Sequence, residues 1–236
     1  MTPRLLFTRP GDELQRGRLA ARAAGFELLA APLLAIEELA FTIPEGAFDA
    51  LLFTSPRTPS IVAARAPDLR ALPCCAVGPR TAEAAAAAGF AVALAGATDG
   101  VEIVGAAARH GFRRLLQPGG EQRIAIPAPA GLSLTALAVY RAVAAESLPA
   151  EAVAALADGP LFATLLFSPR SARIFTGLLQ RHGLGRGSLR LVALSANVAA
   201  AAGDGWRQVA TARRPNLAEA LVAAADLWQK QAHDRA

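Results

Sequence analysis

Two stretches of this sequence are nearly the same: residues 48–57 read FDALLFTSPR, and residues 162–170 read FATLLFSPR. The first residues of the two copies are 114 positions apart. Downstream, AVGPRTAEAAAAAGF (76–90) is echoed by ALSANVAAAAGDGW (193–206). Because the matches keep their order and nearly keep their spacing, they indicate a structural unit that occurs twice in the chain.

A third echo concerns the starts of two helices. Asp99-x-x-Glu102 precedes IVGAAA, and Asn216-x-x-Glu219 precedes LVAAA. This is the spacing of a capping box, in which the first side chain accepts a backbone N–H bond and the glutamate reaches back. Three echoes in one order predict a duplicated α/β unit, and hence two similar lobes with a cleft between them.

Short β-rich runs alternate with longer alanine-rich helical patterns, as in βαβ units on a parallel sheet. The β-rich runs are almost wholly apolar, which is typical of sheets covered on both faces. They predict strands at 4–9, 50–54, 73–77, 113–117, 164–168 and 190–195. Helices are expected at 12–24, 57–65, 80–88, 101–110, 150–157, 171–182, 196–202 and 216–231. The predicted fold class is α/β.

Two alternating, extended segments at 32–42 and 132–146 do not fit the βαβ pattern. If they pair as an antiparallel ribbon, the chain leaves one lobe, builds the second, and returns to finish the first. A two-stranded ribbon is only marginally stable by itself, so we expect mobile lobes. The predicted parts are a discontinuous lobe 1 (1–34 and 146–236), lobe 2 (42–134) and a hinge ribbon (35–41 and 135–145).

The composition of the 236 residues suits a protein with large buried cores, since 53% are hydrophobic and the mean hydropathy is +0.34. No uncharged apolar stretch reaches the about 18 residues of a membrane span, and the N-terminus lacks the apolar region of a secretory signal. Cys74 and Cys75 are adjacent in an apolar run, which favours inert core residues in a reducing cytoplasm. We therefore expect a cytoplasmic protein that does not contact the membrane.

The net charge of +5 is carried by arginine, since Lys230 is the only lysine. Nucleic-acid-binding proteins usually show a basic stripe with aromatic residues, whereas these arginines are scattered singly. Arginine suits carboxylates and phosphates, so an anionic small molecule is the better hypothesis and nucleic acid is not expected. Arginines that only replace lysine on solvated surfaces would explain most of the charge equally well.

Several sequence patterns of cofactor and catalytic sites are absent from the chain. It has no Gly-x-Gly-x-x-Gly after a strand, no P-loop and no Gly-x-Ser-x-Gly. The three histidines, His110, His182 and His233, are far apart in the sequence. We expect neither a metal site nor a cofactor.

Small polar residues follow the predicted strands, at the end where open parallel sheets bind ligands. Helix N-termini placed there favour anions. The candidate binding residues are Thr8, Arg9, Thr54, Ser55, Arg57, Gly78, Thr81, Ser168, Ser171, Ser195 and Asn197. In a purely structural interpretation, Ser55, Ser168 and Asn197 only cap helices. The stretch QPGGEQR (117–123) could cradle an anion or form a plain turn.

Tyr140 is the only tyrosine in the chain and lies in the predicted hinge beside Arg141. A phenol can donate a proton, or a hydrogen bond, to an oxygen leaving group. Tyr140 is therefore the candidate catalytic residue. Alternatively, it is an amphipathic side chain that covers the hinge.

The ordered set TRP, FTSPR, AVGPRTAEA, VYR, FSPRSA, ALSANVA and PNLAEAL resembles the uroporphyrinogen-III synthase family over essentially the whole chain. The resemblance implies two flavodoxin-like lobes with parallel sheets, joined by a two-stranded antiparallel hinge. It also implies a lyase that needs no cofactor and cyclises hydroxymethylbilane, a linear tetrapyrrole, to uroporphyrinogen III. Water is lost and the last ring, ring D, is inverted through a spiro intermediate.

The resemblance also implies residue roles and partners. Tyr140 matches the hinge tyrosine that assists departure of hydroxide, and Ser55, Thr81, Ser168 and Ser195 match positions in the cleft. The implied protein is a cytoplasmic monomer of heme biosynthesis, and a transient contact with hydroxymethylbilane synthase stays open. Between Gln117 and Tyr140, where the family has a helix and a strand, this chain has the short, proline-containing stretch RIAIPAPAGLSLTALAV. A non-catalytic bilobed module that binds an anionic small molecule is the alternative.

Overall fold

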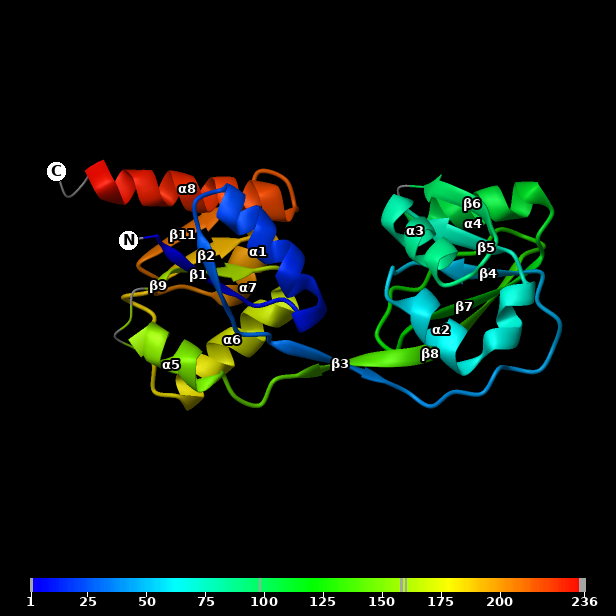
Figure 1. Ribbon diagram of the computed structural model, residues 1–236, viewed down its shortest axis with the longest axis horizontal. Helices are drawn as coiled ribbons and strands as arrows, with labels where there is room; N and C mark the ends of the chain where they lie inside the picture. The colour runs from blue at the N-terminus through cyan, green and yellow to red at the C-terminus, as the bar shows by residue number, and fades with distance from the viewer. Residues whose placement is uncertain (1, 98, 158, 160, 234–236) are drawn as a thin grey trace. The chain divides into compact units, whose positions relative to one another are not determined.

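The computed structural model describes residues 2–97, 99–157, 159 and 161–233. Its contacts divide the chain into two compact units. Unit 1 consists of Met1–Ala35 and Val143–Ala236, and unit 2 of Ile36–Ala142. Each unit holds a mostly parallel sheet with helices on both faces, which confirms the α/β fold class (Figure 1).

Unit 1 contains a five-stranded sheet in which all the neighbouring strands are parallel. The strand order is β11-β10-β9-β1-β2, which is the flavodoxin-like order of doubly wound folds. The strands are β1 (Arg4–Phe7), β2 (Glu27–Ala30), β9 (Leu161–Leu166), β10 (Arg190–Ala193) and β11 (Gln208–Thr211).

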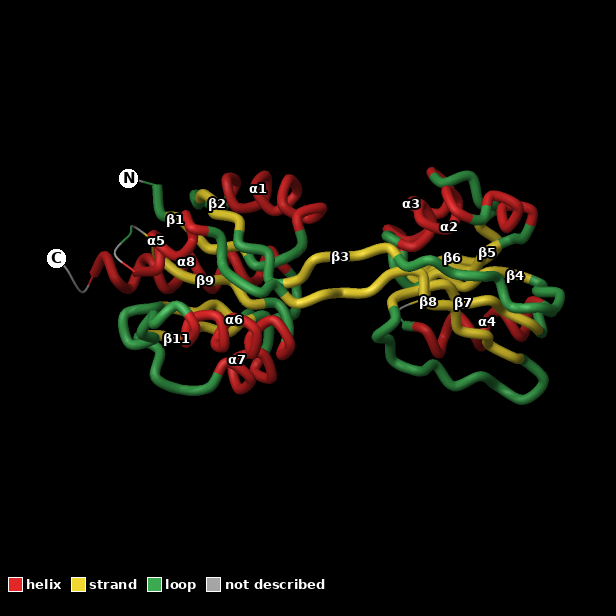
Figure 2. The backbone as a smooth tube through the Cα atoms, turned by 90° about the horizontal axis from the view of Figure 1, so that it is seen from below, coloured by secondary structure: helices red, strands yellow, loops and turns green. Residues whose placement is uncertain are grey.

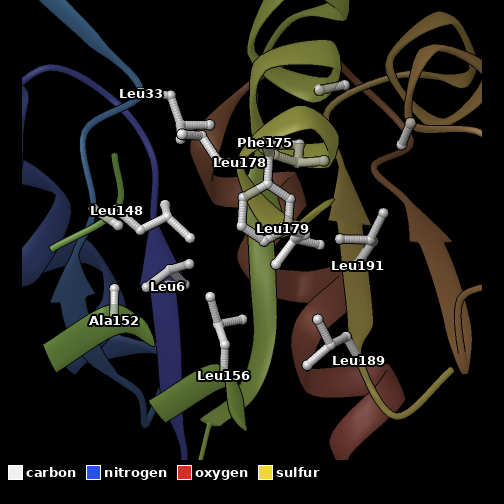
Figure 3. Packing of buried hydrophobic residues seen from close by; sticks show 14 of the residues in the cluster. Leu6, Leu33, Leu148, Ala152, Leu156, Phe175, Leu178, Leu179, Leu189 and Leu191 are labelled. Carbon is white, nitrogen blue, oxygen red and sulfur yellow. The ribbon is translucent and has the colours of Figure 1, made fainter. Parts of the chain in front are cut away.

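Helices cover both faces of this sheet. One face packs against α1 (Leu14–Ala23), which follows the 3-10 turn η1 (Gly11–Glu13), and against α8 (Leu217–His233). The other face packs against α5 (Ala150–Ala157), α6 (Pro169–Arg181) and α7 (Ala196–Ala202). In this second core, Phe175 of α6 is fully buried among leucines from the sheet and the helices (Figure 3).

Unit 2 contains a six-stranded sheet in the order β3-β8-β7-β4-β5-β6. Its strands are β3 (Leu34–Glu38), β4 (Ala50–Phe53), β5 (Cys74–Val77), β6 (Val92–Ala97), β7 (Arg114–Gly120) and β8 (Ser133–Ala144). The helices are α2 (Thr58–Arg65), the 3-10 helix η2 (Pro67–Ala71), α3 (Pro79–Ala87) and α4 (Gly100–His110). Figure 2 shows α2 and α3 on one side of this sheet and α4 on the other, in agreement with two separate cores.

The two sheets are circular permutations of one another. In unit 2, β4-β5-β6 run outward from the centre, as β9-β10-β11 do in unit 1. These are the halves that carry the repeated sequence, since FDALLF leads into β4 and FATLLF into β9. On the other side of the central strand lie β7 and β8 in unit 2, and β1 and β2 in unit 1. In unit 1, β1 and β2 precede the repeated half in the chain, whereas in unit 2, β7 and β8 follow it.

The connection between β1 and β2 in unit 1 differs from the one between β7 and β8 in unit 2. In unit 1, α1 links β1 to β2, whereas residues 121–132, which link β7 to β8, contain neither helix nor strand. A cavity of about 430 Å³ opens beside this segment, and Gln117, Ile126 and Leu134 are among its lining residues. The family resemblance implied a helix and a strand between Gln117 and Tyr140. The strand is present as β8, and residues 121–132 contain no helix.

Strands β3 and β8 are the two segments in which the chain crosses from one unit to the other. Leu39 N–H donates to the Val139 carbonyl, and Ala145 N–H donates to the Leu33 carbonyl, both at 3.0 Å. Residue numbers rise along one strand as they fall along the other, so the strands are antiparallel, as predicted for the hinge. A cross-strand ion pair joins Arg141 to Glu37 at 2.8 Å.

Two sequence expectations need correction. Gln117–Gly120, interpreted as part of an anion-binding loop or a turn, belong to β7 and pair with β8 from Ala136 to Tyr140. Their backbone groups are therefore used in the sheet and do not form a loop. Strands β2, β6 and β11 were not predicted, although all three lie in the sheets.

Asp49 ties the start of β4 to the start of β7. One of its carboxylate oxygens accepts the backbone N–H groups of Arg113, at 2.7 Å, and Arg114, at 2.8 Å. These two bonds, first among the causes, hold the pKa of Asp49 below its ordinary value of 3.8. The ionised form is therefore favoured in the folded protein.

We expect Asp49→Asn to lower the free energy of unfolding at neutral pH. Because the folded-state pKa is depressed, this contribution is present above the unfolded pKa and is lost as the pH falls through the folded pKa. Urea denaturation from pH 7 down to below pH 3.8 should show the two proteins converging in stability in acid. A difference that stays constant to the lowest pH would contradict this account.

Candidate functional site

In open parallel sheets, ligands bind at the carboxyl ends of the strands where the strand order reverses. In unit 1 this switch point lies between β1 and β9, and in unit 2 it lies between β4 and β7. Most of the sequence-predicted site residues follow one of these four strands or the neighbouring β5 and β10.

At the switch point of unit 1, Thr8 and Arg9 follow β1. The Thr8 hydroxyl is buried and donates to the Leu165 carbonyl on β9 at 2.6 Å. The Arg9 guanidinium lies 4.3 Å from the centre of the Phe167 ring and forms an ion pair with Glu13. The strand ends are thus fixed to each other, and the Thr8 proton is already used within the protein.

Ser168 and Ser171 form a capping box at the start of α6. Each hydroxyl accepts the other residue's backbone N–H at 3.0 Å. The two hydroxyl oxygens are also 3.0 Å apart, and the Ser171 hydroxyl donates to the Ser168 carbonyl at 2.8 Å. The capping interpretation of Ser168 is therefore confirmed.

Ser195 and Asn197 lie at the start of α7, after β10. Ser195 occupies the N-cap position, and its side chain makes no capping hydrogen bond. Asn197 is exposed in the first turn of the helix, so the interpretation of Asn197 as a cap is wrong. The strand end is held by the Leu194 N–H, which donates to the Leu166 carbonyl at 2.9 Å.

In unit 2, Thr54 and Ser55 follow β4. Thr54 is exposed, and the Ser55 hydroxyl accepts the backbone N–H of Arg57 at 3.4 Å. Helix α2 begins at Thr58 with Arg57 at the N-cap position, so Ser55 is not the cap of this helix. The hydroxyl instead supports the turn that leads from the strand into the helix.

Gly78 and Thr81 lie where β5 passes into α3. Gly78 is the N-cap residue with φ of 76°, and a Cβ there would meet nothing within 4 Å. Glycine is therefore needed for the backbone conformation and not for space. Thr81 lies in the first turn of α3 and is buried.

Tyr140 lies beside the switch point of unit 2, on β8, the strand next to β7. This half-buried residue of β8 lies against the core under α2 and α3, and it pairs with Gly120 of β7 in the parallel ladder. The Arg57 guanidinium carbon lies 5.9 Å from the centre of the tyrosine ring. Tyr140 and Arg57, named separately from the sequence, are thus brought together. Gly120 was missed, and the only signal for it is a glycine within a strand, which often marks a close backbone approach.

The remaining reactive groups are inert or dispersed. Burial raises the pKa of Cys74 to about 11 and that of Cys75 to about 12, so neither forms a thiolate at neutral pH. This confirms them as core residues. Within the described part of the chain, no three His, Cys, Asp or Glu side chains gather as metal ligands would. Among the described helices, none has the length and apolar character needed to cross a membrane.

The sequence matches the family described as Uroporphyrinogen-III synthase HemD over residues 17–223. The chain belongs to the uroporphyrinogen-III synthase family. Family membership assigns it uroporphyrinogen-III synthase activity, an enzymatic cyclisation in tetrapyrrole biosynthesis.

A solved structure of a uroporphyrinogen-III synthetase has the same fold. That of the Helicobacter pylori 26695 enzyme superposes with a TM-score of 0.65 at 15% sequence identity, covering 95% of this chain and 99% of the other. A mutant enzyme from the extremely thermophilic bacterium Thermus thermophilus gives a TM-score of 0.48 at 17% identity, covering 97% and 99%. Among curated proteins, no match was found.

Proposed function

We propose that this enzyme converts hydroxymethylbilane to uroporphyrinogen III with loss of water and inversion of ring D. The observation that carries the proposal is the placement of the only tyrosine, Tyr140, beside Arg57 and beside the last residue of β7, next to the switch point of unit 2. A phenol at the ligand-binding edge of a sheet is a proton donor in the place where a substrate is expected.

The substrate carries eight carboxylates, and the carboxyl edges of both sheets offer groups that bind anions. Helix N-termini supply N–H groups and a favourable dipole. We propose that Thr54, Ser55, Ser195 and Asn197, which are exposed or half-buried, contribute hydroxyl or amide donors together with Arg9 and Arg57. The strand ends and helix starts that present these donors are held by Thr8, Gly78, Thr81, Ser168 and Ser171.

In the proposed reaction, the bond between the terminal carbon and its hydroxyl oxygen breaks. The Tyr140 phenol gives its proton to the departing hydroxide, which leaves as water. Negative charge then builds on the phenol oxygen, and the positive charge of Arg57 favours it. The final ring closure forms a bond at the unsubstituted α-carbon of ring D, the proton on that carbon is released, and this proton restores the phenol.

Positioning decides which isomer forms. The bilane ionises readily, so the enzyme contributes chiefly by holding one folded conformation of the substrate. Attack at the substituted carbon of ring D gives the spiro intermediate, and inversion then yields isomer III. Closure without inversion yields isomer I. No strong acid–base pair is required for this task.

We expect that Arg9→Ala, Arg57→Ala and Arg170→Ala each weaken the affinity for hydroxymethylbilane by less than tenfold. Ordering an arginine side chain costs about 1.5–2 kcal/mol of rotamer freedom. Exposed ion pairs return only about 0–1 kcal/mol. Arg9 is in addition already engaged with Glu13 and Phe167. Added salt should weaken binding only moderately.

Initial-rate measurements of KM for the three variants test this expectation. Arg207→Ala is a matched control, because Arg207 is exposed and directly precedes β11, at the amino end of that strand. If one of the three variants no longer bound hydroxymethylbilane while Arg207→Ala bound it normally, the substrate would be held by an arginine clamp and not mainly by backbone amides and hydroxyls.

The proposal extends to the protein's surroundings. We expect it to act as a monomer in the cytoplasm and to need no cofactor, with at most a transient contact with hydroxymethylbilane synthase. Sedimentation velocity at micromolar concentration checks the oligomeric state.

For the activity itself, purified protein is mixed with freshly prepared hydroxymethylbilane and the rate of macrocycle formation is followed. Ring closure no faster than without protein would refute the proposal.

A further inference from the structure

Gly120, the last residue of β7, lies unusually close to the reactive end of Tyr140. A Cβ placed on Gly120 would be 3.0 Å from Cε2, 3.1 Å from Cζ and 3.2 Å from the phenol oxygen of Tyr140. Carbon atoms in contact normally stay about 3.5–4.0 Å apart. A side chain at residue 120 would therefore displace the ring by a few tenths of an ångström.

The backbone conformation does not explain this glycine. Gly120 is not among the glycines with positive φ, so another residue could adopt its conformation. Within a strand, glycine weakens the sheet and is found where another group approaches closely. The group that approaches Gly120 is the phenol end of Tyr140.

Two further contacts hold the same tyrosine. Its carbonyl accepts the N–H of Glu121 at 2.8 Å, which fixes the β8 backbone beside the end of β7. The Arg57 guanidinium lies over its ring. The register of the ladder shifts between Gly119 and Gly120, so that Gly119 pairs with Ala138 and Gly120 with Tyr140.

We propose that Gly120 is a positioning residue for the reaction: its missing side chain sets where the phenol oxygen of Tyr140 lies. This inference rests on the proposed role of Tyr140. A displacement of the reacting groups by about 1 Å can cost roughly a hundredfold in rate. A methyl group on Gly120 requires a shift of a few tenths of an ångström, and it acts directly on the oxygen-bearing end of the ring.

The test compares Gly120→Ala with Gly119→Ala. Gly119 is the preceding residue of the same strand, is also buried and also lacks a positive φ, yet a Cβ there meets nothing within 4 Å. We expect Gly120→Ala to lower kcat by about three- to tenfold with KM unchanged within twofold. Gly120→Val should lower kcat further, and Gly119→Ala should change it by less than twofold.

A spectroscopic measurement separates positioning from a general loss of structure. Because the chain has one tyrosine, tyrosine labelled with ¹³C at Cζ gives a single resonance from Tyr140. Gly120→Ala should shift this resonance, and Gly119→Ala should leave it unchanged. In a Tyr140→Phe background, Gly120→Ala should lower kcat by less than twofold, since the oxygen that it displaces is gone.

Equal kcat values and unchanged resonances in the two alanine variants would overturn the inference. If Tyr140→Phe itself keeps the wild-type kcat, the proposed role of the phenol fails, and a shifted resonance in Gly120→Ala would still show the contact. If Gly120→Ala does not fold, the double variant with Tyr140→Ala should fold again, because the clash is with the ring. Failure of that rescue would also contradict the inference.

Discussion

Replacing Tyr140 with phenylalanine is expected to slow formation of uroporphyrinogen III by roughly ten- to a hundredfold, the range of a general-acid contribution. The substitution removes one oxygen and keeps the ring, so the packing on Gly120 and the contact with Arg57 are retained. The thermal unfolding midpoint should therefore stay close to that of the wild type. The loss arises because the departing hydroxide no longer receives a proton from the enzyme.

The matched control for this experiment is Thr135→Val. It removes one hydroxyl from the same strand, β8, at a residue that pairs with Leu116. Initial rates are measured for both variants with freshly prepared hydroxymethylbilane, and the control should lose less than twofold. An effect of Tyr140→Phe under about twofold would mean that positioning alone carries the catalysis and that Tyr140 is a structural residue of the ribbon.

The largest expected effect on stability is that of Phe175→Ala, which should lower the free energy of unfolding of unit 1 by about 3–5 kcal/mol. The Phe175 side chain is fully buried in the core between α6 and the sheet, near Leu6 and Leu191 (Figure 3). Its ring is also stacked on Trp206, with 6.2 Å between the centroids. Alanine would leave a cavity that the surrounding helices and strands can close only in part.

Urea denaturation followed by tryptophan fluorescence measures this loss in the right unit, because Trp206 and Trp228 are the only tryptophans and both lie in unit 1. Arg173→Ala is the control, since Arg173 is exposed on the same helix. It should change the free energy of unfolding by less than about 0.5 kcal/mol. A loss below about 1 kcal/mol in Phe175→Ala would mean that this core is not packed as described.

The central strands could be predicted from the sequence, whereas the edge strands β2, β6 and β11 could not. Strands β4 and β9 are covered by helices on both faces, so they read as continuous apolar runs. Strand β6 reads VALAGA and β11 reads QVAT, and such short runs with alanine, glycine or glutamine have little β-propensity. Strand β2, also four residues long, follows directly on the alanine-rich α1. Their pairing with neighbouring strands decides their conformation.

Helix starts were predictable where two positions carried the signal. Asp99 accepts the Glu102 N–H, and Asn216 accepts the Glu219 N–H, both at 2.9 Å, which confirms the first of the two bonds that the capping-box spacing predicted. In Ser195-Ala-Asn197, the sequence interpretation took Asn197 as the cap, although a serine stands two residues before it. The structure places Ser195 at the N-cap position and Asn197 within the helix.

The candidate site was predictable as a list of residues but not as an arrangement. Tyr140 stood out because it is the only tyrosine, and Arg57 because it follows a strand. Their proximity depends on the register of β8 against β7 and on where α2 begins, and neither is encoded locally. The same register brings Gly120 under the phenol. From the sequence, Pro118-Gly119-Gly120 was interpreted as a turn or part of an anion-binding loop, so the contact between Gly120 and Tyr140 could not be predicted. It arises because β7 continues to Gly120.

The isomer composition of the product directly tests whether this protein forms uroporphyrinogen III. Purified protein is incubated with freshly prepared hydroxymethylbilane, the products are oxidised to porphyrins, and isomers III and I are separated by chromatography. We expect isomer III to predominate, and the Tyr140→Phe reaction to shift the product toward isomer I as spontaneous closure competes. Isomer I alone, formed at the rate seen without protein, would show a non-catalytic module that only binds its anionic ligand.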